Sequence, residues 1–102
     1  MALDFYILAT KEYLFGLESN KFFDLEEEIF IPFKHRTGIY INEYGNSRLS
    51  IDHQKLLVKI IDEYIKKTDL NKDKSKTKNI LEFRGLLFFF IEKNYSLELF
   101  GD

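Results

Sequence analysis

The sequence contains no cysteine and no tryptophan, and only one proline and five glycines among its 102 residues. Without cysteine the chain forms no disulfide and no thiolate metal site, so nothing in it requires an oxidising compartment. It also lacks a long apolar run: residues 86–91 form the most apolar stretch, which is far shorter than the roughly 20 residues that span a bilayer. We therefore expect no membrane partner.

The first residues also lack the features of a secretory signal. They have no basic opening region, and Asp4, Lys11 and Glu12 interrupt the apolar residues. A soluble cytoplasmic protein is the expectation.

Residue patterns that carry catalytic or metal chemistry are scarce as well. The two histidines, His35 and His53, show neither HxxxH nor HExxH spacing. Gly45 and Asn46 have no second glycine nearby with which to shape a phosphate loop, and no serine lies in a nucleophile elbow. We interpret the histidines as surface or capping residues and Gly45-Asn46 as a turn. The sequence predicts no cofactor, no metal and no enzyme.

What the sequence does contain is a large supply of rings and an uneven distribution of charge. Eleven Phe and six Tyr, within a hydrophobic content of 45%, predict one domain, 1–102, with an aromatic core. The formal net charge is −2, but residues 1–30 hold seven acids against two lysines, a balance of −5. Residues 66–78 hold six lysines against two aspartates, a balance of +4. An acidic chain is a poor candidate for generic nucleic-acid binding.

The N-terminal third predicts a strand pair followed by a helix. Residues 3–9 and 13–17 are rich in strand formers, and their short link favours an antiparallel hairpin. Phe22, Leu25 and Ile29 then follow helical spacing from about residue 21. Pro32 predicts that the helix ends near Phe30, and a strand over 28–33 is the alternative. Residues 34–37 are expected to form a polar connector that ends at a left-handed Gly38.

The stretch 38–67 holds the clearest helix signal. An extended run over 39–41 and a turn over 44–47 precede Ser50, which is a good N-cap, and Asp52 suits the first turn. The stripe that follows predicts a helix to Lys67, with Leu57 and Ile61 facing the core.

The last third predicts a loop, a helix and a strand. Residues 68–78 are lysine-rich and almost free of large apolar groups, which favours a flexible surface loop within the same domain. Residues 79–94 are apolar almost all round and predict a buried helix, with a strand over 85–92 as the alternative. Residues 96–100 predict a strand that pairs with the first hairpin. The expected fold is α+β: about three helices on a small antiparallel sheet.

Four acids stand close together at Asp24, Glu26, Glu27 and Glu28. Consecutive helical residues point about 100° apart, so these four cannot converge on one ion. They form either a solvated helix face or a docking surface for a positively charged partner.

Three pieces of the sequence, MALDFYIL, TGIYINEYGNSRLSIDHQKLL and LELFGD, together resemble small bacterial immunity proteins. Such proteins are encoded beside toxins of contact-dependent growth inhibition and other polymorphic toxin systems. Tyr44-Gly45-Asn46 followed by Leu49-Ser50 matches their turn and helix cap, and the pieces cover about a third of the chain. The resemblance implies a stoichiometric inhibitor that binds the C-terminal domain of its cognate toxin in the cytoplasm, with no catalysis of its own.

Many such toxins are nucleases with basic clefts, so the implied toxin-binding residues are Asp24, Glu26, Glu27 and Glu28. Two alternatives remain from other classes. One is a small nucleic-acid-binding or regulatory module that uses 66–78, although that segment has no aromatic residue on which a base could stack. The other is a homodimeric structural subunit held together by surplus aromatic side chains.

Overall fold

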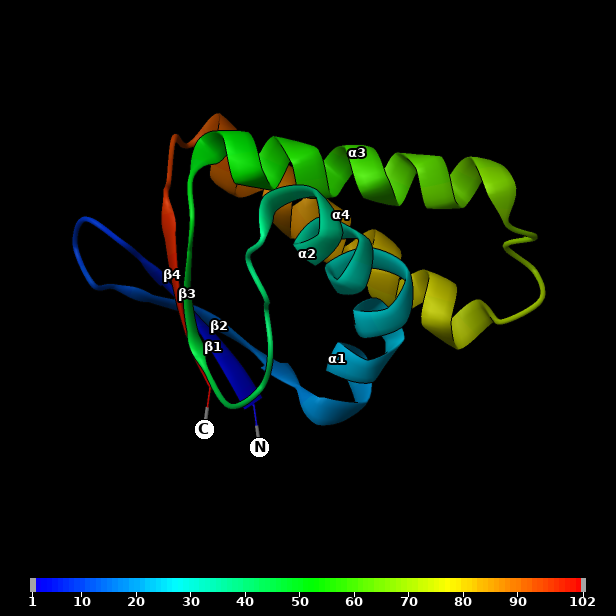
Figure 1. Cartoon of the computed structure of the whole chain (residues 1–102), viewed down its shortest axis with the longest axis horizontal. Helices are drawn as coiled ribbons and strands as arrows, with labels where there is room; N and C mark the ends of the chain where they lie inside the picture. The colour runs from blue at the N-terminus through cyan, green and yellow to red at the C-terminus, as the bar shows by residue number, and fades with distance from the viewer. Residues whose placement is uncertain (1, 102) are drawn as a thin grey trace.

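The computed structural model describes residues 2–101, which form one four-stranded antiparallel sheet with all helices packed on one of its faces (Figure 1). Along the chain these are β1 (Ala2–Ile7), β2 (Tyr13–Glu18), α1 (Ser19–Leu25), the π-helical η1 (Glu26–Phe30), α2 (Ile31–Thr37), β3 (Asn46–Leu49), α3 (Ile51–Lys67), α4 (Lys74–Glu92) and β4 (Leu97–Gly101). The order in the sheet is β2-β1-β4-β3. The α+β class and the antiparallel N-terminal hairpin are confirmed.

Because side chains alternate along a strand, one face of the sheet packs against the core and the other, outer face is partly exposed. Leu3, Phe5 and Ile7 of β1 are buried, as are Leu97 and Leu99 of β4. β4 pairs with β1 as the sequence predicted, with Phe5 opposite Leu99. Rings fill this core: Phe5 stacks on its cross-strand neighbour Phe15 of β2 at 4.4 Å and meets the edge of Phe83 of α4 at 6.0 Å.

The outer face of the sheet carries a carboxylate between two cations. Glu98 accepts a hydrogen bond from Lys11 Nζ at 2.6 Å, and its other oxygen lies 3.4 Å from Arg48 Nε. The hydrogen bond from Lys11 holds the pKa of Glu98 below its ordinary value. The ion pair ties the β1–β2 turn to β4.

The first helical segment does not end at Phe30, contrary to the sequence prediction. It continues without a break to Thr37, and the residues expected as a polar connector form the last turn of α2. Pro32 lies in the first turn of α2, directly after the wide turn of η1. A π-type turn spaces the backbone more openly than an α-turn, so the proline ring fits where it would clash in a regular helix. The alternative strand over 28–33 is wrong, and Gly38 ends the helix with φ of +78° as predicted.

Helix α3 is the element that the sequence predicted best. Ser50 Oγ accepts from His53 N at 3.2 Å, and His53 Nδ1 accepts from Ser50 N at 3.2 Å, which makes a reciprocal cap. The capping interpretation of His53 is confirmed. The short strand β3 just before this cap was not predicted, because its sequence Asn-Ser-Arg-Leu is mostly polar and has no strand period.

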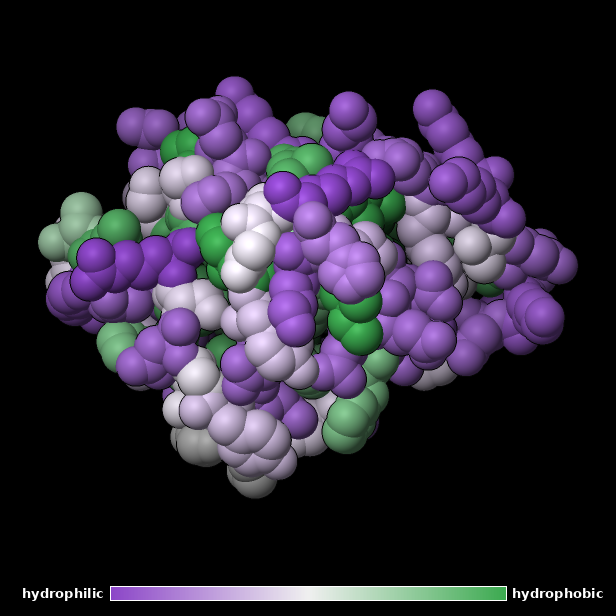
Figure 2. All heavy atoms as spheres, viewed as in Figure 1, coloured by the Kyte–Doolittle hydropathy of each residue, from purple (hydrophilic) through white to green (hydrophobic). Residues whose placement is uncertain are grey.

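The segment between α3 and α4 is shorter than the predicted loop over 68–78. α4 begins at Lys74 instead of residue 79, because Asp73 Oδ1 accepts from Lys76 N at 3.0 Å and caps the helix. The end of the molecule that carries this connection is strongly hydrophilic (Figure 2). The strand alternative for 85–92 is wrong: these residues lie within α4.

Hydrogen bonds from Gln54 and Gly101 connect the ends of the helices and strands. Gln54 is fully buried, and its Nε2 donates to Tyr95 O at 2.7 Å and to Leu49 O at 3.4 Å, joining the start of α3 to the α4–β4 turn. At the far end of β4, Gly101 N donates to Gly45 O at 2.9 Å. The chain from Gly38 to Gly45 returns past the helical segment to the turn that opens β3 (Figure 1).

Candidate functional site

The four acids expected to bind a partner lie on different sides of the first helical segment. Asp24 accepts from Asn79 Nδ2 at 2.6 Å, and Glu28 lies 3.7 Å from Lys76 Nζ. Both therefore face α4, where each has a partner. Glu27 is exposed, and Glu26 is half-buried on another side of the segment.

Glu26 lines a surface hollow of about 310 Å³ between the helical segment and the 38–45 connection. Three exposed rings share this hollow: Phe23, Tyr40 and Tyr44 are 63%, 46% and 70% accessible. Large exposed rings at one place mark an interaction site more often than scattered ones do. We call Phe23, Glu26, Tyr40, Glu43 and Tyr44 the acidic aromatic hollow.

The second carboxylate of the hollow, Glu43, is largely buried and is held by a hydrogen bond from α1. Its side chain is only 6% accessible, and Oε2 accepts from Ser19 Oγ at 2.5 Å. The pair joins the 38–45 connection to the first turn of α1. A fixed carboxylate at the base of a hollow is preorganised for a cation.

The backbone around Tyr44 is also fixed. Asn42 Oδ1 accepts from Tyr44 N at 2.8 Å in a local turn, and Gly101 holds the following residue, Gly45. Lys34 Nζ lies 4.4 Å from the centre of the Tyr40 ring, which gives that ring a cation on one face. Hydrogen bonds therefore hold the backbone beneath Tyr44, whereas the third ring, Phe23, is carried by helix α1.

The chemistry of the hollow favours a positively charged protein group. Ring faces attract guanidinium and ammonium groups, and Glu26 and Glu43 supply opposite charge beside them. Aromatic residues are also the side chains that most often dominate a protein interface. The arrangement suits insertion of a partner's arginine or lysine between rings and carboxylates.

The sequence could identify only part of this hollow. Glu26 belongs to the predicted acidic group, whereas Tyr44 was interpreted as part of a turn and Phe23 was given no role. The available signal was an aromatic residue outside the helical stripe: Phe23 follows Phe22, and only Phe22 fits the spacing of Leu25 and Ile29. Glu43 had no signal, because its role depends on the contact with Ser19.

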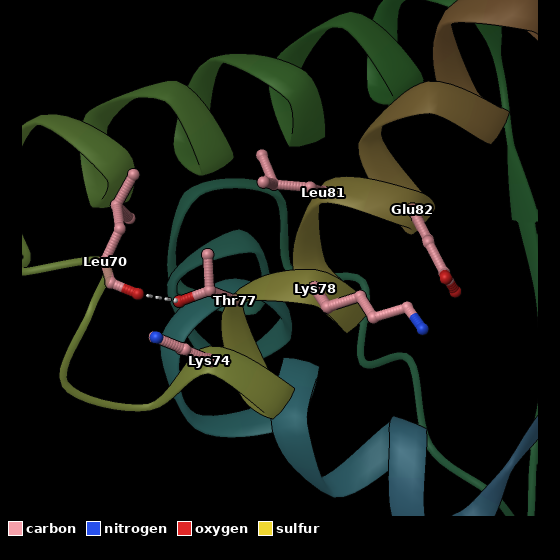
Figure 3. A pocket seen from close by; sticks show the side chains of 6 residues that line it. All are labelled: Leu70, Lys74, Thr77, Lys78, Leu81 and Glu82. Atoms are coloured by element: carbon pink, nitrogen blue, oxygen red, sulfur yellow. Dashed lines mark hydrogen bonds between the residues drawn. The ribbon is translucent and has the colours of Figure 1, made fainter.

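Two of the lysines of 66–78 line a second, shallower hollow of about 480 Å³ at the start of α4, whose lining is Leu70, Lys74, Thr77, Lys78, Leu81 and Glu82. Figure 3 shows Thr77 donating to Leu70 O, a bond of 3.2 Å that fixes the loop against α4. Lys76 pairs with Glu28 instead of joining the other lysines. No aromatic side chain lines this hollow, so it offers no stacking platform for a base.

Within residues 2–101, no three His, Asp or Glu side chains stand together in a way that could hold a metal ion. No helix in that range has the length and apolar character needed to cross a membrane. Comparisons with protein-family models, with curated proteins and with solved structures find no match.

Proposed function

We propose that this protein is an immunity protein that neutralises a cognate toxin domain. It would bind the toxin's substrate surface through the residues of the acidic aromatic hollow and so block access of the substrate. The observation that carries the proposal is the hollow itself, where Glu26 and Glu43 lie among three exposed rings, one from α1 and two from the 38–45 connection. The resemblance of the turn over 44–50 to immunity proteins points to the same part of the chain. The toxin that fits best is a nuclease.

A nuclease cleft is basic because it binds phosphates, and a carboxylate-bearing surface can occupy it in place of nucleic acid. Charge attraction speeds the encounter, and buried rings then slow the dissociation. In this account Glu26 and Glu27 steer the approach, whereas Phe23 and Tyr44 supply the buried contacts. Asp24 and Glu28 stabilise the fold through Asn79 and Lys76 and contribute little to binding.

The direct test uses the C-terminal domain of the secreted protein encoded immediately upstream. Tyr44→Ala removes a ring that is 70% accessible, so the fold is unaffected. Loss of an interface ring costs about 2 kcal/mol, which is about a 30-fold weaker Kd. The readouts are isothermal titration calorimetry and survival of cells that produce the toxin domain.

The matched control is Tyr13→Ala, which removes another exposed tyrosine, on β2. It should leave both binding and survival unchanged. Equal losses from Tyr44→Ala and Tyr13→Ala would show that the hollow is not the contact surface. Absence of any binding by the wild-type protein would contradict the proposed function itself.

A further inference from the structure

A ridge of apolar side chains runs along the solvent side of α4, away from the sheet and away from the acidic aromatic hollow. Leu81, Phe88 and Phe89 are 44%, 49% and 49% accessible. The opposite side of the helix packs into the core through Ile80, Phe83, Leu87 and Phe90. The fold therefore does not explain why these three side chains are apolar.

The centre of this ridge is Gly85, which is exposed and lies in the interior of a 19-residue helix. Glycine is the poorest helix former apart from proline. A Cβ built at Gly85 meets nothing within 4 Å, so no neighbour in this chain excludes alanine there. Glycine at such a place suits the close approach of a second backbone.

The residues around Gly85 are arranged so that the ridge complements itself. Leu81 precedes Gly85 by four residues, and Phe88 and Phe89 follow it by three and four. Lys78 lies seven residues before Gly85, and Glu92 lies seven residues after it. Two copies of α4 crossing antiparallel at Gly85 would therefore place Leu81 opposite the partner's phenylalanines and Lys78 opposite its Glu92.

We propose that two copies of this chain form a two-fold symmetric dimer through this ridge, with the two α4 helices crossing at Gly85. A second copy is the occupant because the charge pattern about Gly85 is self-complementary, as a two-fold interface requires. In residues 2–101 neither Lys78 nor Glu92 has an ion-pair partner within the chain, so both charges are available.

The surface of the ridge is shaped for such a contact. The hollow at the start of α4 is lined by Lys78 and Leu81, two of the residues that face the partner (Figure 3). It provides the space into which a partner's phenylalanine ring fits. Phe88 is already held by the guanidinium of Arg84, whose Cζ lies 4.7 Å from the ring centre. An oriented ring loses little freedom on binding.

The first experiment is cross-linking at Gly85. The chain has no cysteine, so Gly85→Cys introduces a single thiol. Because a two-fold axis at residue 85 brings the two sulfurs together, copper phenanthroline and air should convert most of this variant to a covalent dimer. Lys55→Cys, on the exposed side of α3, is the control and should remain mostly monomeric. Equal cross-linking of both variants would overturn the proposal.

The second experiment exchanges the charges and measures association by sedimentation equilibrium. Lys78→Glu or Glu92→Lys alone places like charges opposite each other and should weaken the dimer about 10-fold. The double variant restores opposite charges and should regain the wild-type dissociation constant. Both residues are exposed, so circular dichroism should show an unchanged fold.

A wild-type protein that remains monomeric up to about 200 µM would overturn the proposal, since a specific helix contact should associate at that concentration. A double variant as weak as the two single variants would also overturn it. Binding of the toxin domain depends on the other side of the molecule, so either result leaves the proposed function untouched.

Discussion

Replacing Gly101 with alanine should strongly destabilise the protein, although the change adds only one methyl group. A Cβ at this position would lie 2.3 Å from Glu43 O and 2.8 Å from Gly45 N. Ordinary contacts of a Cβ begin near 3.4 Å, so the backbone of 43–45 would have to move by roughly 1 Å. That movement would also strain the hydrogen bond from Gly101 N to Gly45 O.

The cost can be worked from these contacts. Overpacking against a backbone costs about 1–3 kcal/mol, and loss of the hydrogen bond from Gly101 N to Gly45 O adds about 1 kcal/mol. Alanine also restricts the unfolded chain, which offsets about 0.5 kcal/mol. A net loss of about 1.5–3.5 kcal/mol corresponds to a fall in Tm of about 6–28 °C for a domain of this size.

The matched variant is Gly85→Ala, which makes the same chemical change with the opposite expected result. No atom lies within 4 Å of the added Cβ, so only helix propensity changes. The unfolding free energy should rise by about 1 kcal/mol. Both variants are compared by urea denaturation at about 1 µM, where a weak dimer is dissociated. A loss under about 1 kcal/mol for Gly101→Ala would refute the close approach of β4 to the 43–45 turn.

The other predictions concern single side chains. Gln54→Met keeps the length of a buried side chain but leaves Tyr95 O without its donor, so the unfolding free energy should fall by about 1–3 kcal/mol. The control is Lys55→Met at the exposed neighbouring position, which should change the unfolding free energy by less than about 0.5 kcal/mol. Equal effects of the two variants would show that the hydrogen bonds of Gln54 do not stabilise the fold. Glu98→Gln should lower Tm at pH 7, because Lys11 lowers the pKa of Glu98 in the folded state. The charged carboxylate therefore stabilises the fold at pH values above 4.5, the ordinary pKa of this group. That stabilisation is lost as pH falls through the lowered pKa, so the difference from wild type should shrink in acid; a difference that stays constant with pH would refute the assignment.

The elements that sequence predicted well are those specified by nearby residues. Helix α3 was predictable from its N-cap Ser50 onward because the cap, the first-turn acid and the apolar stripe all lie within one segment. The end of the first helical segment was predicted wrongly because Pro32 was judged as if in a regular helix. Its tolerance depends on the wide turn of η1, which packs against α3 and has no local signature.

In the candidate site too, sequence predicts what depends on nearby residues and misses what depends on tertiary packing. Asp24 and Glu28 stand one helical turn apart, so sequence could place them on a shared side, but it could not show that α4 would cover that side. Tyr40 and Tyr44 line the same hollow as Glu26 only because the 38–45 connection returns past the helical segment. This proximity joins residues 14 and 18 positions apart in the sequence and follows no period. It therefore becomes visible only in three dimensions.

If the acidic aromatic hollow binds a basic toxin domain, reversal of one of its charges should weaken that binding in a salt-dependent way. Glu26→Lys reverses a charge in the hollow, and Glu12→Lys makes the same change in the β1–β2 turn, at the opposite end of the strands. We expect Glu26→Lys to weaken binding of the upstream toxin domain at least about 10-fold at low salt, with a smaller loss at high salt, whereas Glu12→Lys should bind almost as tightly as wild type. Identical affinities for the two variants at every salt concentration would contradict it.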